Sequence, residues 1–294
     1  FIRGIYIGIR NPRTHEDTDD REEHALKILT AIDLALSYLN RQVADFDVVG
    51  FVNRIFEPHF VPTQAYAETL LEDVPAASTL NVFRQAFLRY QDADSKDIEN
   101  ILRSLQQLMS DDELEEAAGD FSKELQKDLT DGQFAAVFRL MKPEIWIHLH
   151  ADVRIRMENL LIARCRSGTV DGRSDRVQHG LGSFARKFGR HFDRKRDLAE
   201  TLIDKLTPDW YTQNYVGKFF MSVLPRLVDD DLIEKAAQGL AYAALTNRAI
   251  LVRQRLLEVI ANYPDAWQHA LAEQIQEREY DNPDLAAELL DRIG

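Results

Sequence analysis

The chain has 294 residues, of which 45% are hydrophobic and 29% are charged, so its apolar content is enough for one large core or two ordinary ones. The net charge of -13 argues against a protein that binds nucleic acid over its whole surface, because phosphates require a positive surface. Glycine and proline are few, which excludes long disordered tracts.

The single cysteine and the hydropathy bear on the compartment. Cys165 has no second cysteine to pair with, which is typical of a reducing environment. No apolar run is long enough to span a bilayer, and no signal peptide is visible. We therefore expect a cytoplasmic protein without membrane contact.

The first 45 residues divide into an apolar segment, a polar hexapeptide and a helix. Residues 1–9 are rich in isoleucine and aromatic side chains, and residues 10–15 read RNPRTH. From about residue 21 to residue 43, leucine and isoleucine recur at spacings of three and four, which predicts an amphipathic helix. Because the chain opens at Phe1 inside an apolar helical pattern, without a methionine, we expect further residues upstream.

The hexapeptide contains the side chains that RNA cleavage without a metal requires. Pro12 fixes its own φ and disfavours the helical conformation at Asn11, so the chain should bend there and aim Arg10, Asn11 and His15 at one point. A histidine exchanges protons near neutral pH, and an arginine stabilises the charge that develops on a phosphate. Asn11 would orient the phosphate or hold the tautomer of His15.

The residues around this motif resemble the end of a HEPN domain, in the abortive-infection-like branch of that superfamily. They comprise Gly4, Gly8 and Ile9 before the hexapeptide and an Ala/Leu-rich helix ending near Leu39-Asn40-Arg41. The family motif is an arginine, four to six residues of which the first is polar, and a histidine, carried on a bundle of four to five helices. The resemblance covers about residues 1–43, and the earlier helices of such a bundle are absent.

The resemblance implies specific roles. Arg10 would be the motif arginine, Asn11 the polar residue and His15 the histidine. The implied activity is a metal-independent endoribonuclease with no cofactor and an RNA substrate. It would act as a homodimer or higher oligomer in which both motifs face one cleft, in phage defence or as a toxin.

Without its flanking residues, the spacing of arginine and histidine is unspecific. The pattern of an arginine, four to six residues and a histidine occurs at three other places, namely Arg54…His59, Arg173…His179 and Arg186…His191. The alternative interpretation of residues 10–15 is a plain turn, in which Arg10 pairs with a neighbouring carboxylate and His15 caps a helix. Only the Asn-Pro break and the flanking residues distinguish the first occurrence.

After the first helix the pattern changes twice. Residues 46–75 contain Gly50, Pro58, Pro62 and Pro75 and predict an ordered connector. Beyond it, almost everything reads as helices of ordinary length. Three helix starts are predicted, namely a capping box at Ser110-Asp111-Asp112-Glu113, Thr130-Asp131-Gly132, and Thr207-Pro208-Asp209 with Pro208 in the first turn.

Two features favour stacked helical pairs in this second part. Residues 105–117 (LQQLMSDDELEEA) faintly resemble residues 224–236 (LPRLVDDDLIEKA). Strand patterns are scarce, and residues 144–156, which alternate in hydrophobicity, also carry a helical stripe that favours a helix. On a helix His148 and His150 point apart, so we predict no metal site there.

Residues 151–200 oppose the acidic balance of the chain, with twelve Lys/Arg against seven Asp/Glu. On a helix, phenylalanines at 184, 188 and 192 would form one apolar stripe flanked by basic side chains, namely Arg186, Lys187, Arg190 and Arg194. These four are the candidate nucleic-acid-binding residues. The alternative, which we favour, buries the phenylalanines and pairs the arginines with the acidic remainder of the chain.

The sequence therefore predicts an all-α fold with a partial HEPN-like helical bundle (residues 1–45), a connector (46–75) and a larger helical, solenoid-like (HEAT-type) domain (76–294). The predicted function is a metal-independent endoribonuclease whose helical domain senses a trigger or holds a protein partner. The alternative is a non-catalytic helical-repeat scaffold whose N-terminal bundle mediates dimerisation. A third hypothesis is a nucleic-acid-binding regulator.

Overall fold

The computed structural model describes residues 27–34, 36–37, 46–61, 63–92, 95–207, 209–246 and 249–293. Within these residues the fold is all-α, as predicted, and the only strands are two of two residues each. In the part of the chain that the structure describes, no helix is long and apolar enough to cross a membrane.

The helices follow one another with short turns, and η marks the short helical turns between them. The first group is α3 (Val48–Ile55), α4 (Gln64–Leu71), η1 (Ala76–Ser78), α5 (Thr79–Leu88), η2 (Tyr90–Asp92), α6 (Ser95–Leu108), α7 (Asp111–Leu125), α8 (Asp131–Leu140) and η3 (Pro143–His148). The middle group is α9 (Ala151–Ser167), β1 (Thr169–Val170), β2 (Val177–Gln178), η4 (Gly180–Phe184), α10 (Ala185–Phe188) and η5 (Gly189–His191). The last group is α11 (Lys195–Asp204), α12 (Trp210–Phe219), α13 (Leu224–Leu227), η6 (Asp230–Leu232), α14 (Ile233–Ala241), η7 (Tyr242–Thr246), α15 (Ile250–Val259), η8 (Ile260–Asn262), α16 (Asp265–Gln276), η9 (Glu279–Asp281) and α17 (Pro283–Ile293).

Side-chain caps set several of these helix starts. The capping box predicted at Ser110 and Glu113 is confirmed, and Thr130 forms a second box with Gln133 at the start of α8. At α12 the side chain of Asp209 accepts hydrogen bonds from two backbone N–H groups, and the helix begins at Trp210. This start lies later than the predicted first-turn position 208, because the N-cap oxygen comes from Asp209 rather than from Thr207.

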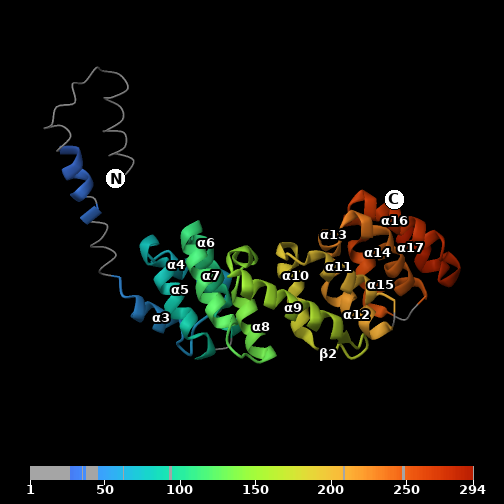
Figure 1. Ribbon diagram of the computed structural model, residues 1–294, viewed down its shortest axis with the longest axis horizontal. Coiled ribbons are helices and arrows are strands. Elements are labelled where there is room, and N and C mark those ends of the chain that lie inside the picture. The colour runs from blue at the N-terminus through green and yellow to red at the C-terminus, as the bar shows by residue number, and fades with distance from the viewer. Residues whose placement is uncertain are drawn as a thin grey trace, which may run out of the picture.

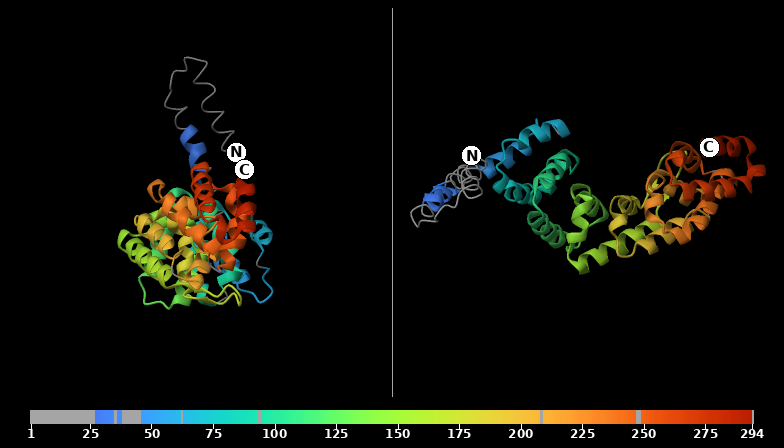
Figure 2. Two further views of the ribbon diagram at one scale, coloured as in Figure 1. Left: turned by 90° about the vertical axis from the view of Figure 1, so that its right-hand side faces the viewer. Right: turned by 90° about the horizontal axis from the view of Figure 1, so that it is seen from above.

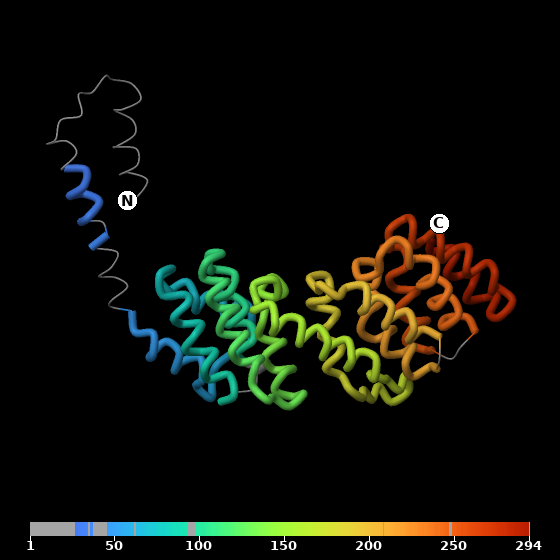
Figure 3. Tube along the Cα trace, viewed as in Figure 1, coloured from blue at the N-terminus to red at the C-terminus, as the bar shows by residue number. Residues whose placement is uncertain are grey.

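The helices form a curved row of two layers (Figures 1 and 3). Helices two apart in the sequence pack side by side, so that α3, α5 and α7 follow one another in one layer and α4, α6 and α8 in the other. Further along the row, α12 packs on α15 and α14 on α16. Seen from above, the row bends into a crescent (Figure 2).

Many hydrogen bonds between neighbouring helical pairs join residues about 35 positions apart. Three examples along the row are Arg89 Nη1 to Asn53 Oδ1 (2.7 Å), Tyr90 OH to Glu124 Oε1 (2.9 Å) and Lys195 Nζ to Asp229 Oδ1 (2.8 Å). Their partners lie 36, 34 and 34 residues apart, respectively. The two similar stretches in the sequence begin at Leu105 and Leu224. The separation of these two positions is not a whole multiple of the spacing of about 35 residues. The first stretch begins α7 with a capping box, whereas the second leads through η6 into α14 without a side-chain cap, so their likeness does not mark a repeat.

One continuous apolar core runs along the row. At its centre, Trp146 of η3 is fully buried and stacks on Phe188 and Phe192 at centroid distances of 4.7 and 5.1 Å. Residues 144–156 are helical, as favoured, although Leu149 and His150 separate η3 from α9.

Two segments differ in detail from their predicted patterns. The predicted connector, residues 46–75, contains α3 and α4, which pack on α5 and α6. Each of these helices has only eight residues, and prolines follow both, so their periodicity is hard to see in the sequence. Residues 27–34 and 36–37, within the predicted amphipathic helix, are helical, and Leu29, Ile32 and Leu36 are exposed there.

Candidate functional sites

The predicted catalytic residues Arg10, Asn11 and His15 lie outside the described residues. Their convergence on one point, and the facing of two copies across a dimer, therefore stay predictions. The structure does place the other three occurrences of the arginine–histidine spacing. They show how the arginine and histidine side chains are arranged where no Asn-Pro break lies between them.

Among the described residues, no hydrogen bond joins the arginine to the histidine in any of these three occurrences. His59 is exposed in the turn after α3. His179 is exposed and adopts a left-handed backbone conformation (φ 53°) before η4. His191 accepts a hydrogen bond from Arg190 Nε at 2.8 Å, and burial, together with the Arg190 charge, lowers the pKa of this imidazole.

The four predicted nucleic-acid-binding residues do not lie on one continuous helix. The chain passes from η4 through the short α10 into η5, so three short helical elements replace one long helix. At Gly189, the first residue of η5, an added Cβ would lie 2.7 Å from the Leu198 side chain. Phe188 and Phe192 are buried and Phe184 is half-buried, so the phenylalanines belong to the core. The helical stripe predicted from the sequence is therefore wrong, but the predicted burial of these rings is confirmed for Phe188 and Phe192.

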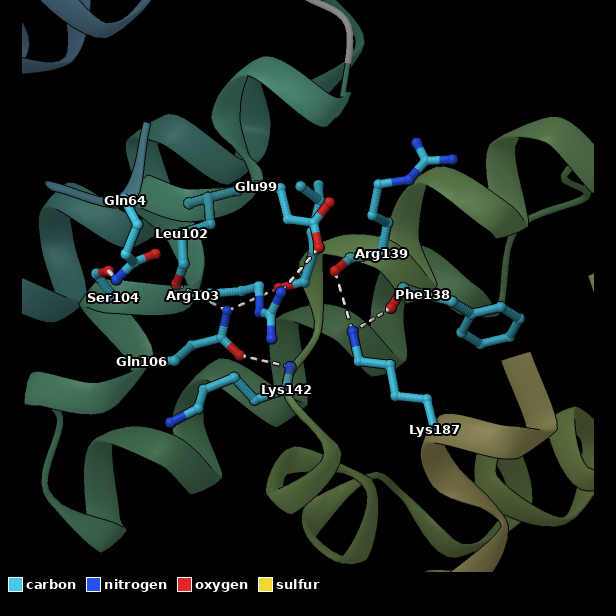
Figure 4. Close-up of polar contacts among 11 residues, drawn as sticks. Gln64, Glu99, Leu102, Arg103, Ser104, Gln106, Phe138, Arg139, Lys142 and Lys187 are labelled. Carbon is cyan, nitrogen blue, oxygen red and sulfur yellow. Dashed lines mark hydrogen bonds and ion pairs between the residues drawn. The ribbon is translucent and has the colours of Figure 1, made fainter. Parts of the chain in front are cut away.

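Lys187 makes a structural contact between two helical pairs (Figure 4). Its Nζ donates hydrogen bonds to the carbonyl oxygens of Phe138 (3.0 Å) and Arg139 (3.1 Å) at the end of α8. Carbonyl groups there have no partner within their own helix, so a cation is well placed. Burial, together with the charge on Arg103, lowers the pKa of Lys187 to about 8.

Gln106 makes the corresponding contact from α6 to the end of α8 (Figure 4). Its side chain is buried, and its Nε2 donates to the carbonyl oxygens of Leu102 (2.8 Å) and Leu140 (2.9 Å). Its Oε1 accepts from the backbone N–H of Lys142 at 2.8 Å. The amide is therefore fully used in joining the two helices.

Most other cations of residues 151–200 are also engaged within the chain. Arg190 Nη2 lies 3.2 Å from Glu144 Oε1, and Arg194 Nε donates to Asp197 Oδ2 at 2.6 Å. Ion pairs or hydrogen bonds to carbonyl oxygens are also formed by Arg154, Arg156, Arg164, Lys195 and Arg196. The favoured alternative, pairing with the acidic remainder of the chain, holds for Arg164, Arg190, Lys195 and Arg196. Arg154 and Arg194 instead pair with Asp193 and Asp197 inside this segment.

Four arginines of this segment are the exception. Within the described residues, none of them forms an ion pair or hydrogen bond through its guanidinium group, and all four are exposed; they are Arg166, Arg173, Arg176 and Arg186. Arg186 lies over the ring of Phe219, with its Cζ 5.9 Å from the ring centroid. The excess positive charge therefore gathers near the β1–β2 hairpin rather than along the phenylalanines.

The hairpin lies between α9 and η4 and packs on α12 (Figure 1). Its strands are antiparallel, with Thr169 opposite Gln178 and Val170 opposite Val177. Asp175, in its turn, adopts a left-handed backbone conformation (φ 57°) and pairs with Lys218 of α12. The hairpin is thus fixed along the surface of α12.

A pocket of about 420 Å³ opens between this hairpin and the start of α12. It is lined by Thr169, Asp171, Arg176, Gln178, Asp209 and Tyr211. Tyr211 is 43% exposed, and its ring stacks on that of Trp210 at a centroid distance of 3.6 Å. No local pattern in the sequence predicts this pocket; the one related sequence feature is the positive charge of residues 151–200.

Neither a metal centre nor a reactive thiol is found among the described residues. They contain no group of three or more His, Cys, Asp or Glu side chains placed to hold a metal ion. His148 ends η3 and His150 precedes α9. Cys165 is fully buried, and burial raises the pKa of its thiol to about 12, which makes it unreactive.

Comparison with known proteins adds no family to these observations. No protein-family model, no curated protein and no solved structure matches the chain. The HEPN resemblance therefore depends on the sequence of residues 1–43 alone, and function has to be argued from that motif and from the helical row.

Proposed function

We propose that the helical row of residues 46–293 is a binding platform that holds a macromolecular partner or trigger. The observation that supports this proposal is the spacing of the contacts, because hydrogen bonds join neighbouring helical pairs about 35 residues apart. A chain built in this way is elongated and offers a large curved surface relative to its size. The predicted solenoid-like (HEAT-type) architecture is part of this proposal.

The pockets along the row favour recognition at the surface over catalysis on a small molecule. The pocket beside the hairpin opens at the surface. A second open pocket, of about 340 Å³, lies between α11 and α14 and is lined in part by Asp204, Lys235 and Arg278. Sites for small molecules enclose most of the ligand surface, which a pocket that is open at the surface does not.

We further propose that the motif Arg10-Asn11-Pro12-x-x-His15 gives the protein a metal-independent endoribonuclease activity. The support is the sequence of residues 1–43, with its Asn-Pro break and its resemblance to HEPN domains. In a symmetric dimer, one copy of His15 would take the proton of the 2′-hydroxyl and the other would protonate the departing 5′-oxygen. Arg10 would stabilise the pentacoordinate phosphate.

The chemistry of the products tests the activity. Attack by the 2′-hydroxyl leaves a 2′,3′-cyclic phosphate on one fragment and a 5′-hydroxyl on the other. The full chain should cleave single-stranded RNA to these ends at the same rate with and without EDTA, and Arg10→Ala should lower the rate at least about a hundredfold. Absence of cleavage by the wild-type chain, or cleavage that EDTA stops, would leave the non-catalytic scaffold as the function.

A further inference from the structure

Three arginines at the β1–β2 hairpin form no ion pair with any residue that the structure describes, although the protein is acidic. Arg173 and Arg176 lie in its turn, and Arg166 lies at the end of α9 just before it. In the described part of the chain, the guanidinium groups of these three arginines have no hydrogen-bonded or ion-paired partner. With a net charge of -13, the chain has ample carboxylates, so unpaired arginines in one place are unexpected.

The carboxylates near the hairpin are engaged in other contacts. Asp171 accepts hydrogen bonds from the backbone N–H of Arg173 at 3.0 Å and from Ser174 Oγ at 2.7 Å. Asp175 pairs with Lys218, and Asp209 Oδ1 caps α12 through Tyr211 N–H at 2.8 Å. These carboxylates form no ion pair with the three arginines, although the backbone N–H and the charge of Arg173 both lower the pKa of Asp171. Arg166 and Arg176 are therefore left available to an external anion.

The pocket beside these arginines combines three kinds of group. Arg176 supplies a guanidinium group that binds phosphate, and the exposed ring of Tyr211 supplies a surface on which a base can stack. Gln178 supplies an amide that can form hydrogen bonds with a base edge or a ribose hydroxyl. The pocket of about 420 Å³ matches one nucleotide better than an extended apolar ligand.

We propose that the hairpin and the start of α12 bind single-stranded RNA, with one phosphate against Arg176 and the adjoining base against Tyr211. Further phosphates lie against Arg173 and the neighbouring arginines. An acidic peptide fits less well, because it has no base to stack on the exposed ring of Tyr211. The inference rests on the proposed function only for the choice of RNA as the ligand.

Fluorescence anisotropy of a short labelled single-stranded RNA measures this binding directly. The full chain is used in a His15→Ala background, so that the RNA stays intact. Replacing Arg173 and Arg176 together by glutamine should weaken binding at low salt at least about tenfold and reduce the salt slope by about 1.4, because each phosphate contact on a single strand contributes about 0.7. Tyr211→Ala should weaken binding about tenfold.

A matched control separates this pocket from net charge. Replacing Arg190 and Arg194 by glutamine removes the same charge from residues that are paired with Glu144 and Asp197. We expect the affinity of this variant to stay within about twofold of the starting protein. Equal weakening in both double variants, or no binding by the starting protein, overturns the inference.

Two further outcomes also decide the question. Displacement of the RNA by polyglutamate at lower concentration than by unlabelled RNA would assign the site to an acidic peptide and overturn the proposal. The hairpin inference and the proposed cleavage fail separately. If wild-type protein cleaves RNA while the hairpin variants bind it normally, only the hairpin inference is lost.

Discussion

Glu158 of α9 is fully buried and holds the turn after η5 in place. Its carboxylate accepts hydrogen bonds from the backbone N–H groups of Asp193 (3.1 Å) and Arg194 (3.0 Å), and from Trp146 Nε1 at 3.4 Å. Removing it leaves the buried Trp146 Nε1 and the two part-buried backbone N–H groups without this acceptor, which is costly. The carboxylate therefore fixes the turn between η5 and α11.

We expect Glu158→Ala to lower the free energy of unfolding by about 3 kcal/mol. Glu158→Gln, which keeps one acceptor oxygen, should lose less than half as much. Urea unfolding monitored by circular dichroism measures both values. An alanine variant within about 0.5 kcal/mol of the wild type would show that the carboxylate does not hold the turn.

Lys187 predicts a dependence of stability on pH. Its pKa is about 8 in the folded chain and near its ordinary value of 10.5 in the unfolded one, so between these values the unfolded state binds more protons. The contribution of Lys187 to stability should therefore rise as the pH rises from about 8 to 10.5. Below pH 8 both states carry the charge, and the contribution should be constant.

Lys187→Met isolates this effect from the other titrating groups. We expect the wild type to gain stability relative to the variant when urea unfolding is measured at pH 10 rather than at pH 7. If the difference in the free energy of unfolding between the two proteins is the same at both pH values, burial does not destabilise the charged ammonium group of Lys187.

Contacts between elements depend on close backbone approach at a few glycines. A Cβ on Gly182 of η4 would lie 2.3 Å from the backbone nitrogen of Cys165 in α9, which rigid backbone does not allow. We expect Gly182→Ala to destabilise the protein by more than about 2 kcal/mol in thermal or urea unfolding.

Gly119 of α7 provides the matched control, because a Cβ added there meets nothing within 4 Å. Gly119→Ala should stabilise the protein by about 0.5–1 kcal/mol, since alanine favours the helix interior. A loss of stability in Gly119→Ala would contradict the open space beside α7. No loss of stability in Gly182→Ala would contradict the close packing of η4 on α9.

The helices were predictable wherever local chemistry decides. Ser110 with Glu113, and Thr130, carry their caps in the adjacent sequence, so these helix starts were found from the sequence. The hairpin was missed because two strands of two residues leave no alternating pattern. The contact of Lys187 with the end of α8 joins positions 49 and 48 residues apart, which no local pattern records.

The same limit applies to the candidate sites. The excess of positive charge in residues 151–200 was visible in the sequence, but the partners of each cation were not. Arg190 is paired with Glu144, whereas Arg176 lines an open pocket. Only the three-dimensional packing separates the structural arginines from the available ones.

At the scale of the whole molecule, the row should not unfold as one unit. Its helical pairs contact mainly their neighbours, so a defect at one end should stay local. Trp267 of α16 is almost fully buried among the last helices. We expect Trp267→Ala to speed amide hydrogen exchange in α14–α17 and leave exchange in α5–α7 unchanged. Equal acceleration in both regions would show a single cooperative unit.

We propose that residues 1–43 cleave RNA and that the helical row of residues 46–293 binds a macromolecular partner or trigger. The most direct test compares RNA cleavage by two single-histidine variants of the full chain in the presence of EDTA. His15→Ala should abolish cleavage, whereas His59→Ala, at an exposed histidine with the same spacing from an arginine, should cleave at the wild-type rate. Cleavage that persists in His15→Ala, or that is lost equally in both variants, would contradict the proposed enzyme.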